Sequence, residues 1–227
     1  MAYLLSIETS TEVCSVALHQ NTNLINTSEF HVEHSHAAKL AVLVDQVLNV
    51  ADIKANQVEA VAISSGPGSY TGLRIGTSLA KGLCFSLNIP LISVGTLELM
   101  AHQILSANSF DVILCPMIDA RRMEVYCLLM DSDANIAQPA TAMVIDELSF
   151  SNLLINHKIV FFGNGAAKCK NVLRHENAVY IDGIYPRASS LGALAFGLWE
   201  KKQFEDLEHF EPFYLKGFVA KKPKTLI

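Results

Sequence analysis

Runs of apolar residues predict three short strands at the start of the chain, over residues 3–9, 13–20 and 23–30. Polar turn residues separate them, at positions 9–12 before the second strand and 21–23 before the third. Strands joined by such short turns pair in antiparallel fashion. The first thirty residues are therefore expected to form a three-stranded meander.

The periodicity then changes to that of helices alternating with single strands. The expected helices are residues 35–51, 73–87 and 96–105, and the expected strands are residues 58–64 and 91–94. A glycine-rich loop, Gly66 to Gly72, leads into the second of these helices. This succession predicts a mixed sheet with helices packed on it.

The same pattern begins again in the second half of the chain. Strands are expected at residues 112–118, 123–130 and 159–162, and helices at residues 146–155 and 189–202. Ser189 or Ser190 is the expected N-cap of the last helix. The repetition predicts an α/β protein with two lobes of mixed sheet flanked by helices, residues 1–105 and 106–227. The extreme C-terminal segment is a candidate to return to the N-terminal lobe.

Composition indicates a folded chain that does not bind nucleic acid by itself. Of the 227 residues 51% are hydrophobic, and the formal net charge is −5. Nucleic-acid binding draws mainly on clustered Lys and Arg, so this balance argues against it. The one basic stretch, residues 216–224, is typical of a solvated C-terminus. Any contact with RNA is expected to depend on a partner.

The cysteines and the N-terminus predict a cytoplasmic protein. Five cysteines, without a CxxC pair, lie within apolar runs, as small buried side chains do in a reducing compartment: Cys14, Cys84, Cys115, Cys127 and Cys169. The first ten residues lack the basic region of a signal peptide, and no apolar run approaches the length of a membrane span. No membrane association is expected.

Three segments, in order along the chain, resemble the TsaB (YeaZ) family: residues 5–11 (LSIETST), 64–76 (SSGPGSYTGLRIG) and 118–126 (IDARRMEVY). With residues 211–216 (EPFYLK), the resemblance covers nearly the whole chain. It implies an actin-like fold of the ASKHA, ribonuclease H-like superfamily. It also implies a non-catalytic subunit that binds TsaD and, with TsaE, supports threonylcarbamoyl transfer to the adenosine beside the anticodon in tRNA. A homodimer is implied when the partner is absent, and tRNA contact only through the complex.

The resemblance argues against an enzyme. The related TsaD proteins carry two histidines four residues apart, on one helical face, where they share a metal. Thr96 and Met100 occupy those positions here, and neither is a suitable ligand. No nucleophile motif or hydrolytic triad appears, which argues against a protease. The cluster His31, His34 and His36 is interpreted as solvated histidines. No catalytic residue and no metal site are expected.

A nucleotide site is the main alternative feature. In the ASKHA superfamily the turn after the first strand cradles phosphate, and the candidate residues here are Thr9, Ser10, Thr11, Gly66, Gly68 and Asp119. Ser and Thr are also favoured in hairpin turns for local reasons. ATP or ADP at the partner interface is the candidate ligand. The alternative function is an ASKHA-type ATP-dependent kinase or hydrolase, which predicts tight Mg-dependent ATP binding by the chain alone.

Two helices have more apolar surface than one core requires. Residues 40–48 include only Asp45 and Gln46 as polar positions. The helix expected over residues 73–87 has a stripe of small residues, Gly72, Gly76 and Ala80. The resemblance places the TsaD interface on these two helices. The residues expected to line or support it are Leu40, Val44, Val47, Gly76, Ala80 and Leu83. Ala80→Glu would then abolish complex formation and leave the monomer folded, whereas unfolding would indicate a buried core. Tyr70 is assigned no role.

Overall fold

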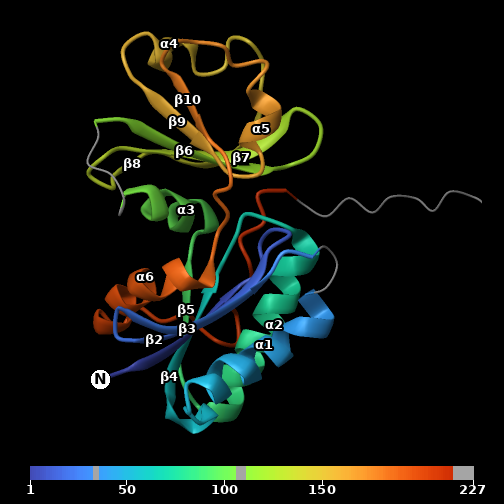
Figure 1. The fold of residues 1–227 in the computed structure, drawn as a ribbon, viewed down its shortest axis with the longest axis vertical. Helices are drawn as coiled ribbons and strands as arrows, with labels where there is room; N and C mark the ends of the chain where they lie inside the picture. The colour runs from blue at the N-terminus through green and yellow to red at the C-terminus, as the bar shows by residue number, and fades with distance from the viewer. Residues whose placement is uncertain (33–35, 106–110, 217–227) are drawn as a thin grey trace, which may run out of the picture.

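The protein consists of two five-stranded sheets, one in each lobe, with helices packed against both (Figure 1). This computed structural model describes residues 1–32, 36–105 and 111–216. Within these ranges, none of the helices is both long and apolar enough to cross a membrane. The predicted α/β fold with two lobes of mixed sheet is confirmed.

The first sheet combines the predicted meander with two parallel strands. Its strands are β1 (Tyr3–Glu8), β2 (Cys14–Gln20), β3 (Asn23–Phe30), β4 (Val58–Ser64) and β5 (Leu91–Val94). The order across the sheet is β3-β2-β1-β4-β5, antiparallel within the meander and parallel from β1 to β5. Neighbouring residues of β1 alternate between the two faces, so that Leu5 joins one core and Leu4 the other.

Helices cover both faces of this sheet. The first face packs against α1 (His36–Val50) and α2 (Tyr70–Leu87), and a single 3₁₀ turn, η1 (Ala55–Gln57), follows α1. The other face packs against α6 (Ala188–Glu200), which arrives from the far end of the sequence. Between α6 and the second sheet lies α3 (Thr96–Leu105), which contacts both.

The second sheet repeats the strand order of the first. Its strands are β6 (Ile113–Asp119), β7 (Glu124–Met130), β8 (Ile136–Val144), β9 (Ile159–Phe162) and β10 (Ala178–Ile181), in the order β10-β9-β6-β7-β8. The pairs β6–β7 and β7–β8 are antiparallel, and β6–β9 and β9–β10 are parallel. Two short helices, α4 (Ser151–Leu154) and α5 (Ala166–Cys169), accompany it. The duplicated architecture predicted from the sequence is therefore observed.

Some local predictions were wrong. The helix expected over residues 146–155 is reduced to the single turn α4, and β8, β10 and α5 were not predicted. The N-cap of α6 is Arg187 rather than Ser189 or Ser190. The hydroxyl of Ser15 on β2 accepts a hydrogen bond from the backbone N–H of Ala188 at 2.9 Å. The start of α6 is thus satisfied by a strand 173 residues away in sequence, which a local pattern cannot reveal.

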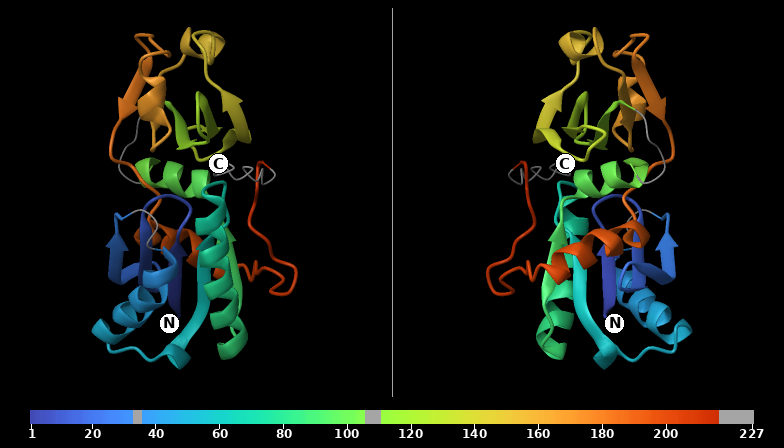
Figure 2. Two further views of the ribbon diagram at one scale, coloured as in Figure 1. Left: turned by 90° about the vertical axis from the view of Figure 1, so that its right-hand side faces the viewer. Right: turned by 90° about the vertical axis from the view of Figure 1, so that its left-hand side faces the viewer.

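After α6 the chain runs back along the first lobe (Figure 2). The backbone N–H of Glu205 donates to the carbonyl of Leu91 at 2.9 Å, and that of Phe213 donates to the carbonyl of Ser65 at 2.7 Å. At Lys216 the chain reaches the second lobe and forms an ion pair with Glu124. Residues 201–216 thereby contact both lobes. The boundary between residues 105 and 106 stays a prediction.

Candidate functional site

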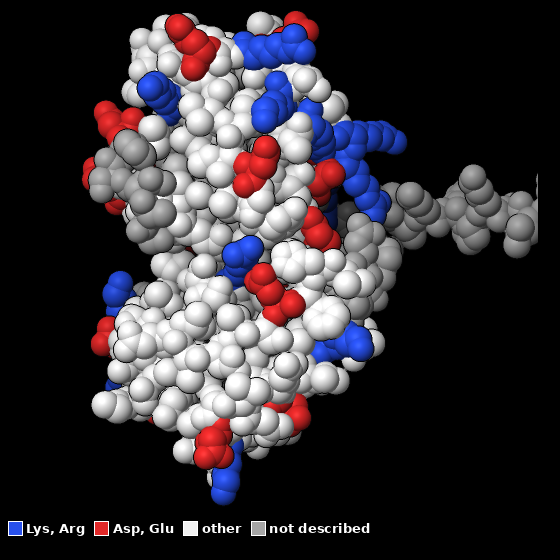
Figure 3. Space-filling model, in the orientation of Figure 1, with Lys and Arg blue, Asp and Glu red and all other residues white. Residues whose placement is uncertain are grey.

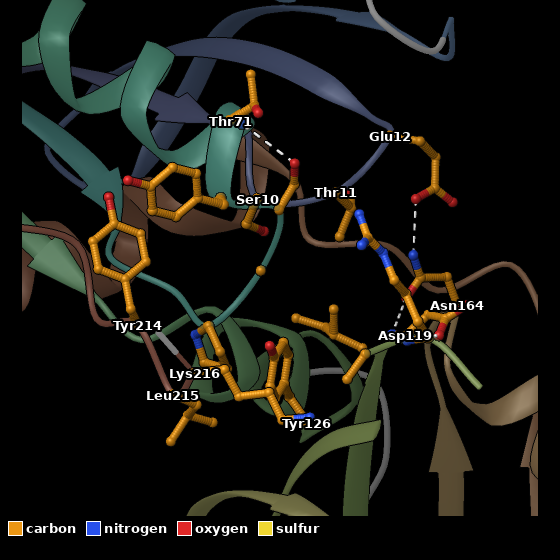
Figure 4. Close-up of a pocket in the computed structure, with 18 of the residues that line it drawn as sticks. Ser10, Thr11, Glu12, Thr71, Asp119, Tyr126, Asn164, Tyr214, Leu215 and Lys216 are labelled. Atoms are coloured by element: carbon orange, nitrogen blue, oxygen red, sulfur yellow. Dashed lines mark hydrogen bonds between the residues drawn. The ribbon is translucent and has the colours of Figure 1, made fainter. Parts of the chain in front are cut away.

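A cleft of about 1240 Å³ lies between the lobes, at the end of β1 and the start of α2. Residues from both sheets and from the C-terminal segment line it (Figure 4). Of the six residues predicted for a nucleotide site, Ser10, Thr11, Gly68 and Asp119 line this cleft. Thr9 and Gly66 lie behind its wall and are buried. The structure thus gathers four of the six at one place.

The turn after β1 is packed closely against the start of α2. The N–H of Ser10 donates to Oε1 of Glu8 at 2.6 Å, and the carbonyl of Ser10 accepts from the N–H of Ser69 at 2.6 Å. A methyl group on Gly72 would overlap with the carbonyl of Thr9. Glycine at 72 is therefore required for this close approach. Several polar groups of the turn are already bonded within the protein.

A carboxyl group lies buried directly before this turn. The Glu8 side chain is fully buried at the end of β1. Burial raises the pKa of this carboxyl, and hydrogen bonds from Ser10 and Ser64 offset part of the effect. The structure shows no cation paired with it among the described residues. Glu8 is therefore poised to remain protonated at higher pH than an exposed glutamate.

The second lobe supplies the opposite wall of the cleft. Asp119, at the end of β6, forms an ion pair with Lys168, with 2.6 Å between Nζ and Oδ1. The side chain of Asn164 bridges the lobes, because its Nδ2 donates to Oε2 of Glu12 at 2.8 Å and its Oδ1 accepts from the N–H of Asp119 at 3.0 Å. In Figure 4 a dashed line marks the hydrogen bond between Asn164 and Glu12, which joins the two lobes beside the cleft.

Tyr70, which the sequence left without a role, forms part of an aromatic wall. Its ring packs against that of Tyr214 with 5.0 Å between centroids. Its hydroxyl accepts a hydrogen bond from Nη1 of Arg74 at 2.6 Å. Tyr70 lines both the interlobe cleft and a second hollow between α1 and α2. Sequence analysis could not pair Tyr70 with Tyr214, since 144 positions separate them.

The predicted interface residues lie mostly inside the first lobe. Leu40, Val44, Val47 and Ala80 belong to its hydrophobic core, Gly76 is buried against Thr9, and Leu83 is half-buried. They hold α1 and α2 on the sheet rather than forming the outer surface. Whether they support a partner interface from beneath stays a prediction.

Of the predicted residues, Leu40 alone also lines the groove on the outer surface of α1 and α2, which is formed mainly by other residues. A groove of about 560 Å³ between the two helices is lined by Ala37, Leu40, Ala41, Tyr70, Thr71, Arg74, Ile75, Ser78 and Leu79. Nearby, Val42 of α1 is 59% exposed and Phe85 of α2 is 83% exposed. Isolated exposed apolar residues are common, but here they lie on the same two helices as an apolar groove. This face is the strongest candidate for contact with another protein.

The histidine cluster does not converge within the described residues. The interpretation as a solvated histidine was wrong for His36, which is buried and whose Nε2 lies 3.0 Å from the carbonyl oxygen of Thr11. His31 is exposed and its Nε2 lies 2.9 Å from Oε1 of Glu29. His34 lies outside the described residues. Across residues 1–32, 36–105 and 111–216, no three His, Cys, Asp or Glu side chains are arranged to hold a metal ion.

Thr96 and Met100, which the resemblance set against the TsaD metal histidines, serve in packing in this structure. Thr96 and Met100 of α3 are both fully buried. The hydroxyl of Thr96 accepts a hydrogen bond from the N–H of Gly66 at 3.1 Å, and Met100 contacts Gly163. Thr96 thus fixes the glycine-rich loop, and Met100 fills the space between the lobes. Neither side chain lines the cleft, so neither presents a metal-ligating atom to it.

The five cysteines are buried, as predicted, and they are free in the structure. Burial raises the pKa of the thiols of Cys14, Cys84 and Cys169 to about 11. At neutral pH these three are therefore thiols rather than nucleophilic thiolates.

Comparisons with known proteins agree with the geometry. A family model described as "TsaD: tRNA N6-adenosine threonylcarbamoyltransferase" matches residues 29–222. The tRNA threonylcarbamoyladenosine biosynthesis protein TsaB of Escherichia coli is 30% identical over 225 residues, which are 96% of each chain. A solved structure from Pseudomonas aeruginosa, described as similar to peptidase YeaZ, is 26% identical and has a TM-score of 0.84, covering 95% of this chain and all of the other.

A more distant structure shares the fold alone. The activator of 2-hydroxyisocaproyl-CoA dehydratase from Clostridium difficile is 8% identical, with a TM-score of 0.52, and covers 96% of this chain and 99% of its own. The actin-like fold expected from the sequence is thus confirmed. Full-length similarity in sequence and in structure shows that the chain belongs to the TsaB (YeaZ) family.

Proposed function

We propose that this chain is a non-catalytic subunit of a tRNA threonylcarbamoyl transferase complex. In this role it binds a TsaD-type enzyme and is required for transfer of the threonylcarbamoyl group to the adenosine beside the anticodon. The observation that carries the proposal is the 30% identity to the Escherichia coli TsaB protein over 96% of both chains. The cytoplasm, where tRNA is modified, is the proposed place of action.

The surface of α1 and α2 supports the partner role. The groove between these helices is apolar, and Val42 and Phe85 are exposed on the same helix pair. A specific interface of standard size buries roughly 1,200–2,000 Å² in total, with an apolar centre. We propose that the transferase docks on this face and that a homodimer uses it when the transferase is absent.

Thr96 and Met100 support placing the catalytic step in the partner rather than in this chain. Both are packing residues at the positions where the related transferase carries its metal histidines. The chemistry is therefore proposed to reside in the TsaD partner, with TsaE as the further component. In this arrangement tRNA reaches the chain only within the complex.

Nucleotide binding is the second candidate. The cleft between the lobes favours it, because Ser10, Thr11, Gly68 and Asp119 line one cavity. ATP or ADP at the partner interface is compatible with the subunit role. An ATP-dependent kinase or hydrolase would instead bind Mg-ATP tightly without any partner.

Reconstitution tests the proposal. The purified chain, the TsaD and TsaE proteins of the same organism and the substrate tRNA would be combined, with assembly followed by light scattering. We expect a complex of this chain with TsaD, and loss of threonylcarbamoyladenosine when this chain is omitted. Failure to assemble, together with ATP turnover by this chain alone, would favour the kinase alternative.

A further inference from the structure

Two adjacent arginines form the tip of the β6–β7 hairpin, where it borders the interlobe cleft. Arg121 and Arg122 both line the cleft and are both exposed. Their backbone φ angles are +71° and +50°, a region that Gly and Asn adopt more readily than Arg. A turn shaped only for folding would favour those residues instead. The structure thus retains two long cationic side chains at a position that is unfavourable for them.

The acidic groups around this hairpin are already paired, whereas the two guanidinium groups are not. Asp119 pairs with Lys168, and Glu124 pairs with Lys216. Within residues 1–32, 36–105 and 111–216, the side chains of Arg121 and Arg122 have no hydrogen-bond or ion-pair partner. Glu12, which lines the same cleft, is hydrogen-bonded to Asn164 rather than to a cation. Four cations therefore stand beside three carboxylates, a small local excess of positive charge on a chain whose net charge is −5. In Figure 3, Lys and Arg side chains project from the edge of the second lobe just above the junction of the lobes.

From this arrangement we propose that Arg121 and Arg122 contact the phosphate backbone of the RNA substrate in the assembled complex. Exposed guanidinium groups without protein partners are well suited to phosphate oxygens, to which they can donate two parallel hydrogen bonds. The inference rests on the proposed function, which brings tRNA to the complex. It adds that this subunit touches the RNA itself, and identifies the residues.

An extended RNA chain explains the position of the two arginines better than a free nucleotide. A free nucleotide would need phosphate donors in the depth of the cleft, where the N–H of Ser10 is bonded to Glu8 and the N–H of Ser69 to the carbonyl of Ser10. The unpaired charges lie instead on an exposed hairpin tip, which an RNA backbone can pass. The excess charge is too small to hold RNA without the partner, because affinity depends on the number of phosphates contacted.

The double variant Arg121→Asn/Arg122→Asn tests the proposal. Asparagine tolerates positive φ, so the hairpin is retained and the melting temperature should not fall. Binding of the unmodified tRNA to the complete complex would be measured over a range of salt concentrations. We expect affinity to fall about tenfold near physiological salt, and the slope of log K against log salt to flatten by about 1.5. Arg174→Asn, on an exposed loop of the same lobe, is the matched control and should leave both unchanged.

Each outcome decides between the possibilities. Unchanged affinity and slope in the double variant, in a complex that assembles and modifies tRNA, would refute the RNA contact and leave the proposed function intact. Loss of ATP binding with unchanged tRNA affinity would assign the arginines to a nucleotide instead. If the wild-type complex did not form, the proposed function itself would fail. The single variants Arg121→Asn and Arg122→Asn provide the same comparison should the double variant not assemble.

Discussion

Gly192 of α6 lies against the ring of His19 on β2, so closely that a methyl group at position 192 would overlap with the imidazole. Nε2 of His19 also lies 3.0 Å from the carbonyl oxygen of Ser189, one turn earlier in the helix. The two contacts fix the position of α6 on the first sheet. Helix α6 is the last helix among the described residues, yet it completes the core formed by the first strands.

Gly192→Ala is therefore expected to destabilise the protein, because the added methyl group must displace either the helix or the imidazole. The expected loss is about 1–3 kcal/mol in the free energy of unfolding, measured by urea denaturation. Gly197→Ala is the matched control in the same helix, where the new methyl group meets no atom within 4 Å. That change should stabilise the protein by roughly 0.5–1 kcal/mol. Equal effects from the two changes would contradict the packing argument.

The buried His19 predicts that stability falls in mild acid. Burial lowers the pKa of its imidazole below the ordinary 6.5. Between the lowered value and 6.5 the unfolded chain binds more protons, so the free energy of unfolding decreases as the pH falls through this window. His102 is shifted in the same direction and for the same reason. His19→Gln should reduce the difference in stability between about pH 7.5 and pH 5.5, and an unchanged difference would show that His19 is not involved.

The buried carboxyl of Glu8 is expected to make the free energy of unfolding depend on pH in the opposite sense. Because burial raises its pKa above 4.5, its contribution is favourable at low pH and is lost as the pH rises through 4.5 towards the raised value. Glu8→Gln removes the ionisation and keeps an oxygen that can accept from the N–H of Ser10. The variant should be more stable than the wild type near neutral pH, with the difference disappearing in acid. A less stable variant near neutral pH would mean that the folded protein holds Glu8 ionised and paired.

The substitution Ala80→Glu is expected to unfold the chain rather than only to prevent complex formation. Ala80 is fully buried in the core between α2 and the sheet. A carboxylate there has no room and no partner, so the cost should reach about 4 kcal/mol or more. We expect the isolated chain to unfold, as judged by circular dichroism. A folded monomer that fails only to bind its partner would mean that Ala80 is exposed after all.

Much of the fold follows from the sequence, because its main elements have strong local patterns. The strands at 58–64, 91–94 and 159–162 and the helix at 96–105 match the structure at both ends. In contrast, β8 has no buried residue and contains Pro139, so it has little apolar alternation to detect. Its pairing with β7 depends on backbone hydrogen bonds, which any sequence can form.

The candidate site was only partly predictable. The motif residues Ser10, Thr11, Gly68 and Asp119 meet in the cleft because each lies at or just after the end of a strand that ends there. The contributions of Asn164, Tyr214 and Lys216 depend on how the second lobe and the C-terminal segment fold back, which no local pattern shows. The apolar stripe of α1 was correctly identified at Leu40, Val44 and Val47, but a stripe alone does not show whether it faces a sheet or a partner.

The partner surface is best tested at Ala41, which is exposed and lines the groove between α1 and α2. Ala41→Glu places a charge in this apolar groove without touching the core. We expect the variant to melt at nearly the wild-type temperature and to bind the TsaD-type partner at least about tenfold more weakly in titration calorimetry. Ala193→Glu is the matched control, because Ala193 is also an exposed helical alanine but lies on α6, across the sheet from the groove. If both variants bound the partner with wild-type affinity, the interface would have to lie elsewhere, and the exposed Phe85 would need another explanation.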